Sequence, residues 1–169
     1  MIHMNKQNVL FAKVKPNAIV PSKRVEDAGA DVYACFEEDY LVINPHETKL
    51  IPTGIASAFS DDWVAILKER GSTGSKGIGQ RCGVIDAGFR GEWFVPLTNH
   101  NKEILVISKL PVEELPLILQ HGIVYPYTKG IAQVLMVEVP KLNFTEVTYE
   151  EILAIESERG TGALGSSGK

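Results

Sequence analysis

The sequence contains 169 residues, 44% of them apolar and 22% charged, which suffices for one domain with a hydrophobic core. Its net charge of −4 argues against a general binder of nucleic acids or anionic membranes. No apolar run exceeds five residues, whereas a membrane helix needs about 20 and a signal peptide an apolar stretch of about 7–15. Two cysteines, Cys35 and Cys82, make neither a disulfide framework nor a metal cluster. We therefore expect a protein of the reducing cytoplasm without a membrane segment.

Short runs of β-branched and aromatic residues predict strands along most of the chain. The predicted strands cover residues 9–14, 31–36, 40–43, 50–58, 63–67, 93–97, 104–107 and 131–139. Clusters of Gly, Pro, Asn and Asp separate them and predict turns, including a long turn over residues 71–79. Many short strands without helices alternating between them indicate an all-β barrel or sandwich.

Helices are a minor part of the prediction. Residues 112–121 predict one short helix ended by Gly122, and Thr148 with Glu151 has capping-box spacing for a second, although a strand is the alternative there. Residues 159–169 are rich in Gly and Ser and predict a flexible C-terminal tail. The sequence thus predicts a single β domain over residues 1–158 with one or two short helices, followed by this tail.

Two segments combine residue types suited to binding phosphate groups, although each alone would more often be an ordinary loop. Glycines at 71, 74 and 77 let backbone N–H groups face an anion, hydroxyl groups donate, and Arg70 supplies a two-pronged donor. The spacing is not that of a Walker A loop, because Lys76 is followed by glycine rather than Ser or Thr. The same combination of Arg, Gly and hydroxyl residues occurs again from Arg159 onward. Two such segments in a small protein indicate a polyphosphate ligand.

Asp86 is the best candidate for a catalytic carboxylate. It follows the apolar pair Val84 and Ile85 and precedes a turn at Gly88. We expect this position to lie near the core, where low dielectric adjusts the strength of a general base. An aspartate that only stabilises the turn is the alternative.

Five segments, taken in order, resemble the motifs of the dUTP pyrophosphatase (dUTPase) family. They are residues 28–34, 70–73 with 76–78, 83–92, 131–133 and 159–168, numbered motifs one to five below. Motif three, Gly-Val-Ile-Asp-Ala-Gly-Phe-Arg-Gly-Glu, is the most specific, and the resemblance covers nearly the whole chain.

The resemblance implies a fold and a reaction. The fold is a distorted β-barrel of jelly-roll-like (β-clip) type, and the assembly is a homotrimer in which every active site takes motifs from all three subunits. The reaction is hydrolysis of dUTP to dUMP and pyrophosphate, which keeps uracil out of DNA, with Mg²⁺ bridging the triphosphate. The C-terminal tail would close over the nucleotide of a neighbouring subunit.

The resemblance also implies roles for single residues. Asp86 would activate the attacking water, and Asp31 would hold Mg²⁺ through its water shell. Within the substrate set, Arg70, Ser72 and Gln133 would contact the phosphate chain. The whole set comprises Arg70, Gly71, Ser72, Gln80 near the uracil, Gly83, Phe89 under the deoxyribose, Gln133, Arg159, Leu164, and Ser166 and Ser167 at the γ-phosphate.

The chain departs from the family pattern at several places. Motif two has the order Arg-Gly-Ser instead of Arg-Ser-Gly, and Lys129 and Gly130 precede Ile131 where Asp-Arg or Glu-Arg is usual. Leu164 stands where an aromatic residue normally covers the uracil. Residues 101–128 are similar to insertions of phage-type dUTPases, which indicates a phage or prophage origin and leaves a repressor-type protein partner open.

The main enzyme alternative is a dCTP deaminase, which shares the fold and a similar third motif. Deaminases carry a catalytic Glu in the following strand, whereas the matching strand here has Pro96 between Val95 and Leu97. Glu92 lies out of register as a substitute. Hydrolysis of dUTP is therefore the predicted activity, with a deaminase-like enzyme or a phage-type regulatory module as alternatives.

Overall fold

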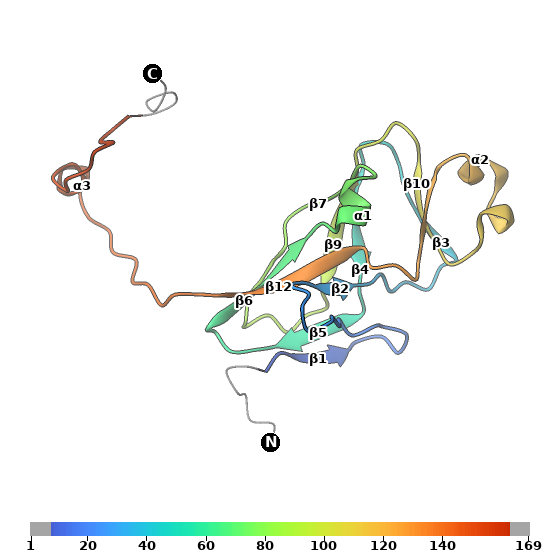
Figure 1. Cartoon of the computed structure of the whole chain (residues 1–169), viewed down its shortest axis with the longest axis horizontal. Coiled ribbons are helices and arrows are strands. Elements are labelled where there is room, and N and C mark those ends of the chain that lie inside the picture. The colour runs from blue at the N-terminus through green and yellow to red at the C-terminus, as the bar shows by residue number, and fades with distance from the viewer. Residues whose placement is uncertain (1–7, 163–169) are drawn as a thin grey trace. The chain divides into compact units, whose positions relative to one another are not determined.

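The computed structural model describes residues 8–162. The chain forms two compact units, Met1–Val139 and Pro140–Lys169. Strands are the main regular secondary structure of the first unit, so the predicted all-β class is confirmed (Figure 1). Among residues 8–162, no helix combines the length and the apolar composition of a membrane span.

Four small sheets build the first unit, and most paired strands are distant in sequence. Only β10 and β11 pair in parallel among the named strands of the described residues. The sheets are, with neighbouring strands in order, β1 (Leu10–Lys13) and β5 (Ile55–Ala58); β11 (Ile123–Pro126), β10 (Leu105–Ser108) and β3 (Tyr40–Ile43); β2 (Ala30–Val32), β12 (Ala132–Glu138), β6 (Trp63–Lys68) and β8 (Val84–Ile85); and β4 (Thr48–Pro52), β9 (Phe94–Asn99) and β7 (Ile78–Gln80).

The core of this unit is formed by alternate side chains of the strands. In β5 the residues Ile55 and Ser57 are buried while their neighbours are partly exposed, as expected when one face of a strand covers a core. Trp93 is fully buried and packs edge-on against Phe11, with ring centroids 5.4 Å apart. The strands therefore owe their stability mainly to burial of these apolar faces.

The strand predicted over residues 50–58 is divided in two, which corrects the prediction. Gly54 has φ +67°, and a Cβ atom there would lie 2.8 Å from Ala18 Cβ and 2.9 Å from Cys35 Sγ. The chain turns at this glycine, so that β4 joins the sheet of β9 and β5 joins β1. The β pattern was visible in sequence, but the turn depends on the close approach of Ala18 and Cys35.

Two other segments differ from the prediction. The turn expected over residues 71–79 contains a helical turn, α1 (Gly71–Gly74), and the short strand β7. The helix expected over residues 112–121 is a 3₁₀ turn, η1 (Val112–Glu114), followed by α2 (Leu117–Gln120), because Pro116 disfavours a helical conformation in the preceding residue. Together with α3 below, this gives three short α-helices within residues 8–162 instead of one or two.

The second unit contains α3 (Tyr149–Leu153), whose predicted capping box is confirmed. The Thr148 backbone N–H donates to Glu151 Oε2 at 2.7 Å, and the Glu151 backbone N–H donates to Thr148 Oγ1 at 3.2 Å. The Thr148 backbone N–H and the Thr148 hydroxyl both donate to the Glu151 carboxylate, and these hydrogen bonds lower the pKa of Glu151 below its ordinary value. From Pro140 to Thr161 every residue of this unit is exposed.

Candidate active site

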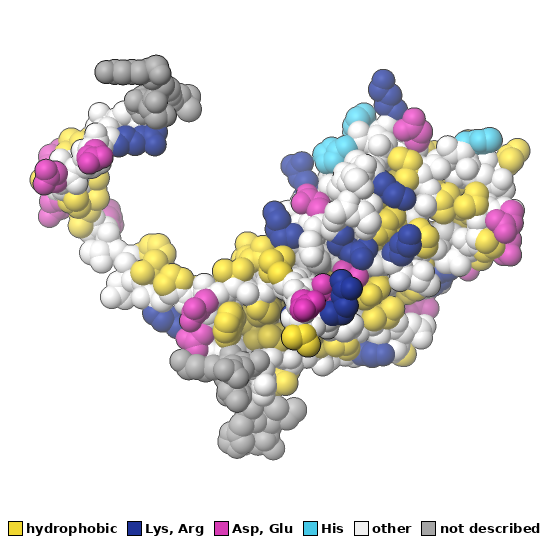
Figure 2. All heavy atoms as spheres, viewed as in Figure 1, with side chains coloured by type: hydrophobic (Ala, Val, Ile, Leu, Met, Phe, Trp, Pro, Cys, Tyr) yellow, Lys and Arg dark blue, Asp and Glu magenta, His cyan; other side chains and the backbone are white. Residues whose placement is uncertain are grey.

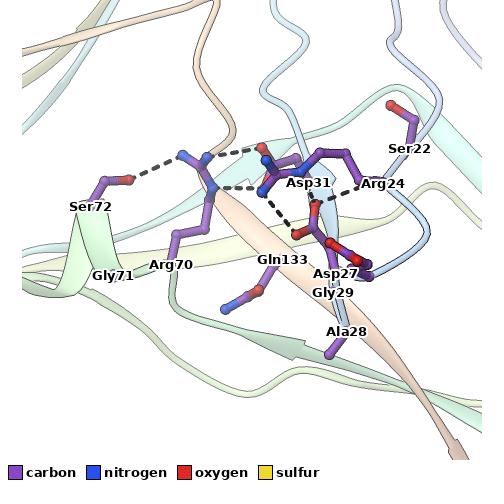
Figure 3. Close-up of a pocket in the computed structure, with 11 residues that line it drawn as sticks. Ser22, Arg24, Asp27, Ala28, Gly29, Asp31, Arg70, Gly71, Ser72 and Gln133 are labelled. Carbon is purple, nitrogen blue, oxygen red and sulfur yellow. Dashed lines mark hydrogen bonds and ion pairs between the residues drawn. The ribbon is translucent and has the colours of Figure 1, made fainter.

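Motifs one, two and four lie together around one pocket of the first unit. Asp31 on β2 pairs in register with Gln133 on β12, and Gln133 pairs with Lys68 at the end of β6, two residues before Arg70. The pocket has a volume of about 710 Å³ and is lined by five predicted site residues, Asp31, Arg70, Gly71, Ser72 and Gln133 (Figure 3). Figure 2 shows Lys and Arg side chains gathered on the face of this unit around α1.

Arg70 is fixed in this pocket by nearly all of its donor groups. Its Nε donates to Asp31 Oδ1 at 2.8 Å and its Nη2 to Asp31 Oδ2 at 2.9 Å, a two-pronged ion pair. Nη1 donates to Gly130 O at 3.0 Å and to Ser72 Oγ at 3.1 Å, and it lies 3.4 Å from the Tyr125 hydroxyl. Partial burial opposes the charge of Arg70, but the Asp31 carboxylate outweighs it, so the pKa of Arg70 is raised. The pocket therefore presents a permanent, oriented cation.

Ser72 reaches the pocket although its place in motif two is unusual. The helical turn α1 begins directly after Arg70, where the Arg70 N–H donates to Thr73 Oγ1 at 3.1 Å and the Thr73 hydroxyl donates to Arg70 O at 2.9 Å. Thr73 is buried and holds this turn closed. Because Ser72 Oγ accepts from Arg70, its own hydrogen is left to donate to an anion. Sequence reasoning did not identify the role of Thr73.

Gln133 is held between two backbone segments. Its Nε2 donates to Glu69 O at 2.8 Å, and a Cβ atom on Gly29 would lie 2.5 Å from its Oε1. Glycine at position 29 is thus required for the amide of Gln133 to lie where it does.

Four pocket residues were not anticipated from the sequence: Ser22, Arg24, Glu26 and Asp27. Arg24 Nε donates to Asp27 Oδ2 at 2.8 Å, and this hydrogen bond lowers the pKa of Asp27. The three-residue spacing of Arg24 and Asp27 could have suggested an ion pair in this loop. Its place at the pocket depends on the β-bridge between Ser22 and Asp31, which no local pattern contains.

The fit of a magnesium ion to this pocket can be tested on Asp31. Both of its carboxylate oxygens accept from Arg70, and each oxygen retains a further lone pair. Within residues 8–162 no three His, Cys, Asp or Glu side chains are grouped to hold a metal ion. Mg²⁺ in phosphate sites usually keeps several waters and takes direct ligands from the substrate. The residues present therefore fit a Mg²⁺ bound to phosphate oxygens and reached by Asp31 through water.

Motif three lies around a second, smaller hollow. Asp86 and Phe89 line it together with Val84 and Phe94, in a volume of about 270 Å³. Asp86 is exposed in the single chain, which corrects the expectation that it lies near the core. The reason is that β8 is a two-residue strand at the sheet edge, and the turn closed by the Phe89 N–H and Asp86 O projects beyond it. Neither Asp86 nor Phe89 lines the Arg70 pocket.

Gln80 and Gly83 shape the loop between β7 and β8. Gln80 Nε2 donates to Cys82 O at 2.7 Å and to Arg81 O at 2.9 Å, so only its Oε1 remains to accept from a ligand. Gly83 has φ +128°, and a Cβ there would lie 2.7 Å from Leu67 O. Gln80 thus stabilises the loop through these two hydrogen bonds to its backbone.

The remaining expected site residues belong to the C-terminal unit. Arg159 is exposed, and its Nε donates to Gly162 O at 2.9 Å. Leu164, Ser166 and Ser167 lie outside the described residues. Their roles stay predictions.

Glu92, the out-of-register candidate for a deaminase, has a structural role. Its Oε1 accepts from the Gly54 backbone N–H at 2.8 Å and lies 3.6 Å from Lys15 Nζ. Pro96 occupies the matching position of β9, opposite Leu50 of β4. The side chains therefore do not supply the carboxylate of a deaminase at this position.

Comparison with known proteins identifies the family. The family model for dUTPase matches residues 15–110. A deoxyuridine 5'-triphosphate nucleotidohydrolase of Gloeobacter violaceus is 34% identical, over 84% of this chain and 83% of that protein, and one of Neisseria meningitidis serogroup A is 32% identical, over 83% and 81%. The matched proteins are all nucleotide hydrolases of this all-β fold class. The chain belongs to the dUTPase family.

Solved structures agree on the fold. A dUTPase of Staphylococcus bacteriophage 80alpha with dUPNHPP has a TM-score of 0.73 at 22% identity, covering 96% of this chain and 99% of that one. A mutant dUTPase of phage phi11 of S. aureus, described with a structural Mg(II) ion, has a TM-score of 0.66 at 23% identity, over 83% and 96%. The jelly-roll-like fold implied by the resemblance is thus confirmed, whereas a repressor-type partner receives no support.

Proposed function

We propose that this protein is a dUTP diphosphatase, which hydrolyses dUTP to dUMP and pyrophosphate. Membership of the dUTPase family supports this activity. The observation that carries it at the level of chemistry is the Arg70 guanidinium, fixed by Asp31 beside the Ser72 hydroxyl in one pocket. The second N–H of Arg70 Nη2 and the Ser72 hydroxyl hydrogen are the donors left in this constellation to bind a phosphate chain.

Positioning and charge neutralisation supply most of the catalysis of phosphoryl-type transfer. Arg70 is held in place before the substrate arrives, so little reorganisation accompanies binding. The Ser72 hydroxyl donates to the same phosphate chain, and Gln133 contributes its amide from the neighbouring strand. No Ser, Cys or His nucleophile is needed for this reaction.

Asp86 acts as the general base in this proposal. It accepts a proton from a water molecule, the water oxygen bonds to the α-phosphorus, and the bond to the bridging oxygen breaks so that pyrophosphate leaves. Asp86 lines a different hollow from Arg70 within one chain. A homotrimer would complete the site by bringing motif three of one subunit to the Arg70 pocket of another. Exposed Val84, Phe89 and Phe94 around Asp86 support such a contact.

Mg²⁺, when bound to the triphosphate, neutralises its charge and holds it in one geometry. Asp31 would hold the ion through a water molecule, as its remaining lone pairs allow. A cytoplasmic nucleotide pool is the setting this activity predicts.

The decisive experiment is a panel of nucleotides assayed for pyrophosphate release with and without Mg²⁺. We expect release from dUTP, stimulation by Mg²⁺, and little release from UTP, dCTP or dTTP. Ammonia release from dCTP, or pyrophosphate release from all nucleotides alike, would contradict the proposal.

Phe89 is predicted to select deoxyribose. A ring packed under the sugar leaves no space for a 2′-hydroxyl, whereas an ordinary apolar pocket rejects an added hydroxyl by only about 10²-fold. Phe89→Ala should therefore raise the kcat/KM ratio of UTP to dUTP by at least about tenfold. Phe94→Ala, which alters an equally exposed ring of the same hollow, is the control and should leave this ratio unchanged. An equal ratio in both variants would refute the role of Phe89.

Gly29→Ala is predicted to displace Gln133. The new Cβ would lie 2.5 Å from Gln133 Oε1, so the amide must move out of the pocket. Loss of one directed donor at a phosphate should lower kcat/KM for dUTP by about tenfold to 10²-fold. Gly74→Ala, where the nearest atom is 3.9 Å away, is the matched control and should retain full activity. Steady-state kinetics and thermal melting of both variants separate a local effect from unfolding.

A further inference from the structure

Tyr125 lies beneath the guanidinium of Arg70 and is almost fully buried, with 2% of its surface exposed. Its hydroxyl donates to Gly130 O at 2.7 Å and lies 3.4 Å from Arg70 Nη1. Gly130 O accepts from Nη1 as well, at 3.0 Å. The phenol oxygen, the carbonyl oxygen and Nη1 therefore form a closed set on the side of the guanidinium away from Asp31.

The fold fixes the direction of this phenol. Tyr125 belongs to β11, which pairs in parallel with β10, in register with Ile107. Along β11, Val124 packs on the small cluster around Leu115 and Leu119, whereas Tyr125 joins the main core. Residues 101–128, which resemble insertions of phage-type dUTPases, thus contain near their end a strand that places the Tyr125 hydroxyl beside Arg70.

Gly130 provides the space that this arrangement needs. A Cβ atom at position 130 would lie 3.1 Å from Asp31 Cβ and Cγ and 3.3 Å from Arg70 Nε. The glycine therefore lets the Asp31–Arg70 pair lie directly against the backbone. The Tyr125 hydroxyl bonds to the backbone oxygen of this glycine, so both groups meet Arg70 at the same place.

We propose that Tyr125 is a positioning residue for Arg70 in the hydrolysis of dUTP, a role that rests on the proposed function. Asp31 holds one edge of the guanidinium, and Tyr125 with Gly130 O holds the other. Without the hydroxyl, Nη1 loses an acceptor and Gly130 O loses a donor, so the guanidinium and the Ser72 hydroxyl bonded to it turn more freely. The phosphate chain of dUTP would then bind to a guanidinium that is less well ordered.

The test is a double-mutant cycle of Tyr125→Phe with Arg70→Lys, read out as KM for dUTP and as Kd for a non-hydrolysable dUTP analogue. Tyr125→Phe should raise KM and Kd about tenfold, the effect of about one hydrogen bond to a charged group, with a smaller change in kcat. In the Arg70→Lys background the same change should have less than about a twofold effect. The lysine ammonium group has no counterpart of Nη1 to face the Tyr125 hydroxyl.

Tyr127→Phe is the matched control. Tyr127 lies just after β11, and burial together with Cys35 raises the pKa of its hydroxyl, while its ring packs edge-on against Phe36 at 5.0 Å. This variant should leave KM unchanged in both backgrounds. Gly130→Ala, which keeps the phenol but presses on Asp31 and Arg70, should raise KM in its own right.

Two results would overturn the inference. They are an equal effect of Tyr125→Phe in both Arg70 backgrounds and an equal effect of the two tyrosine variants. A wild-type protein that releases no pyrophosphate from dUTP would overturn the proposed function and this inference together, whereas an active wild type with an additive cycle overturns the inference alone.

Discussion

Asp86→Asn is expected to lower kcat for dUTP hydrolysis by about 10²–10⁴-fold, the usual contribution of a general base. The amide keeps the size of the carboxylate but does not accept the proton of the attacking water. Binding of a non-hydrolysable dUTP analogue should change little, because Arg70, Ser72 and Gln133 are untouched. Single-turnover kinetics and calorimetric titration measure the two quantities separately.

Asp39→Asn is a suitable control for this experiment. Asp39 is also an exposed aspartate, and its backbone oxygen accepts from the Lys109 N–H while it lines neither hollow of the proposed site. This variant should hydrolyse dUTP at the wild-type rate. A loss of less than tenfold in kcat for Asp86→Asn would assign the base to another residue.

Removal of residues 159–169 is expected to lower kcat/KM for dUTP by about 10²-fold or more. The deletion takes away Arg159, Ser166 and Ser167, and each donor directed at developing negative charge is typically worth about that factor. The melting temperature should stay close to that of the full chain, because the first unit has its own core. Kinetics and melting curves of the truncated protein test both statements.

The same truncation tests whether subunits share their active sites. Neither tail-less subunits nor Asp86→Asn subunits should hydrolyse dUTP efficiently alone. After subunit exchange, some mixed trimers would draw an intact tail from one chain and an intact Asp86 from another, so part of the activity should return. Exchange verified by mass spectrometry without any recovery would contradict shared sites.

Local patterns along the chain are enough to predict much of the fold. Strands such as β3 and β6 coincide with runs of β-branched and aromatic residues, since such residues pack well on a half-buried surface. The capping box of Thr148 and Glu151 needs only contacts three residues apart, and it formed as predicted. The five motifs in order were enough to identify the family, because they depend on residue identity and spacing alone.

Other features depend on residues that are distant in sequence. β7 has a weak strand pattern with Gly79 at its centre, and β11 is short and ends at Pro126; both form beside β9 and β10, which supply their backbone partners. Gly54 turns the chain because Ala18 and Cys35 leave no room for a side chain. Local sequence patterns do not predict these contacts, because they join residues that are far apart in the chain.

The candidate site divides in the same way. Sequence by itself determined which residues are the candidates for the chemistry, because Asp31, Arg70, Gln133 and Asp86 each stand in a motif. Only the tertiary structure decided which of them meet. The antiparallel register of β2, β12 and β6 brings Asp31 and Gln133 beside Arg70, whereas Asp86 stays in a separate hollow at the sheet edge. The physical reason is that strand pairing joins segments across many tens of residues, and burial of a common core selects that pairing.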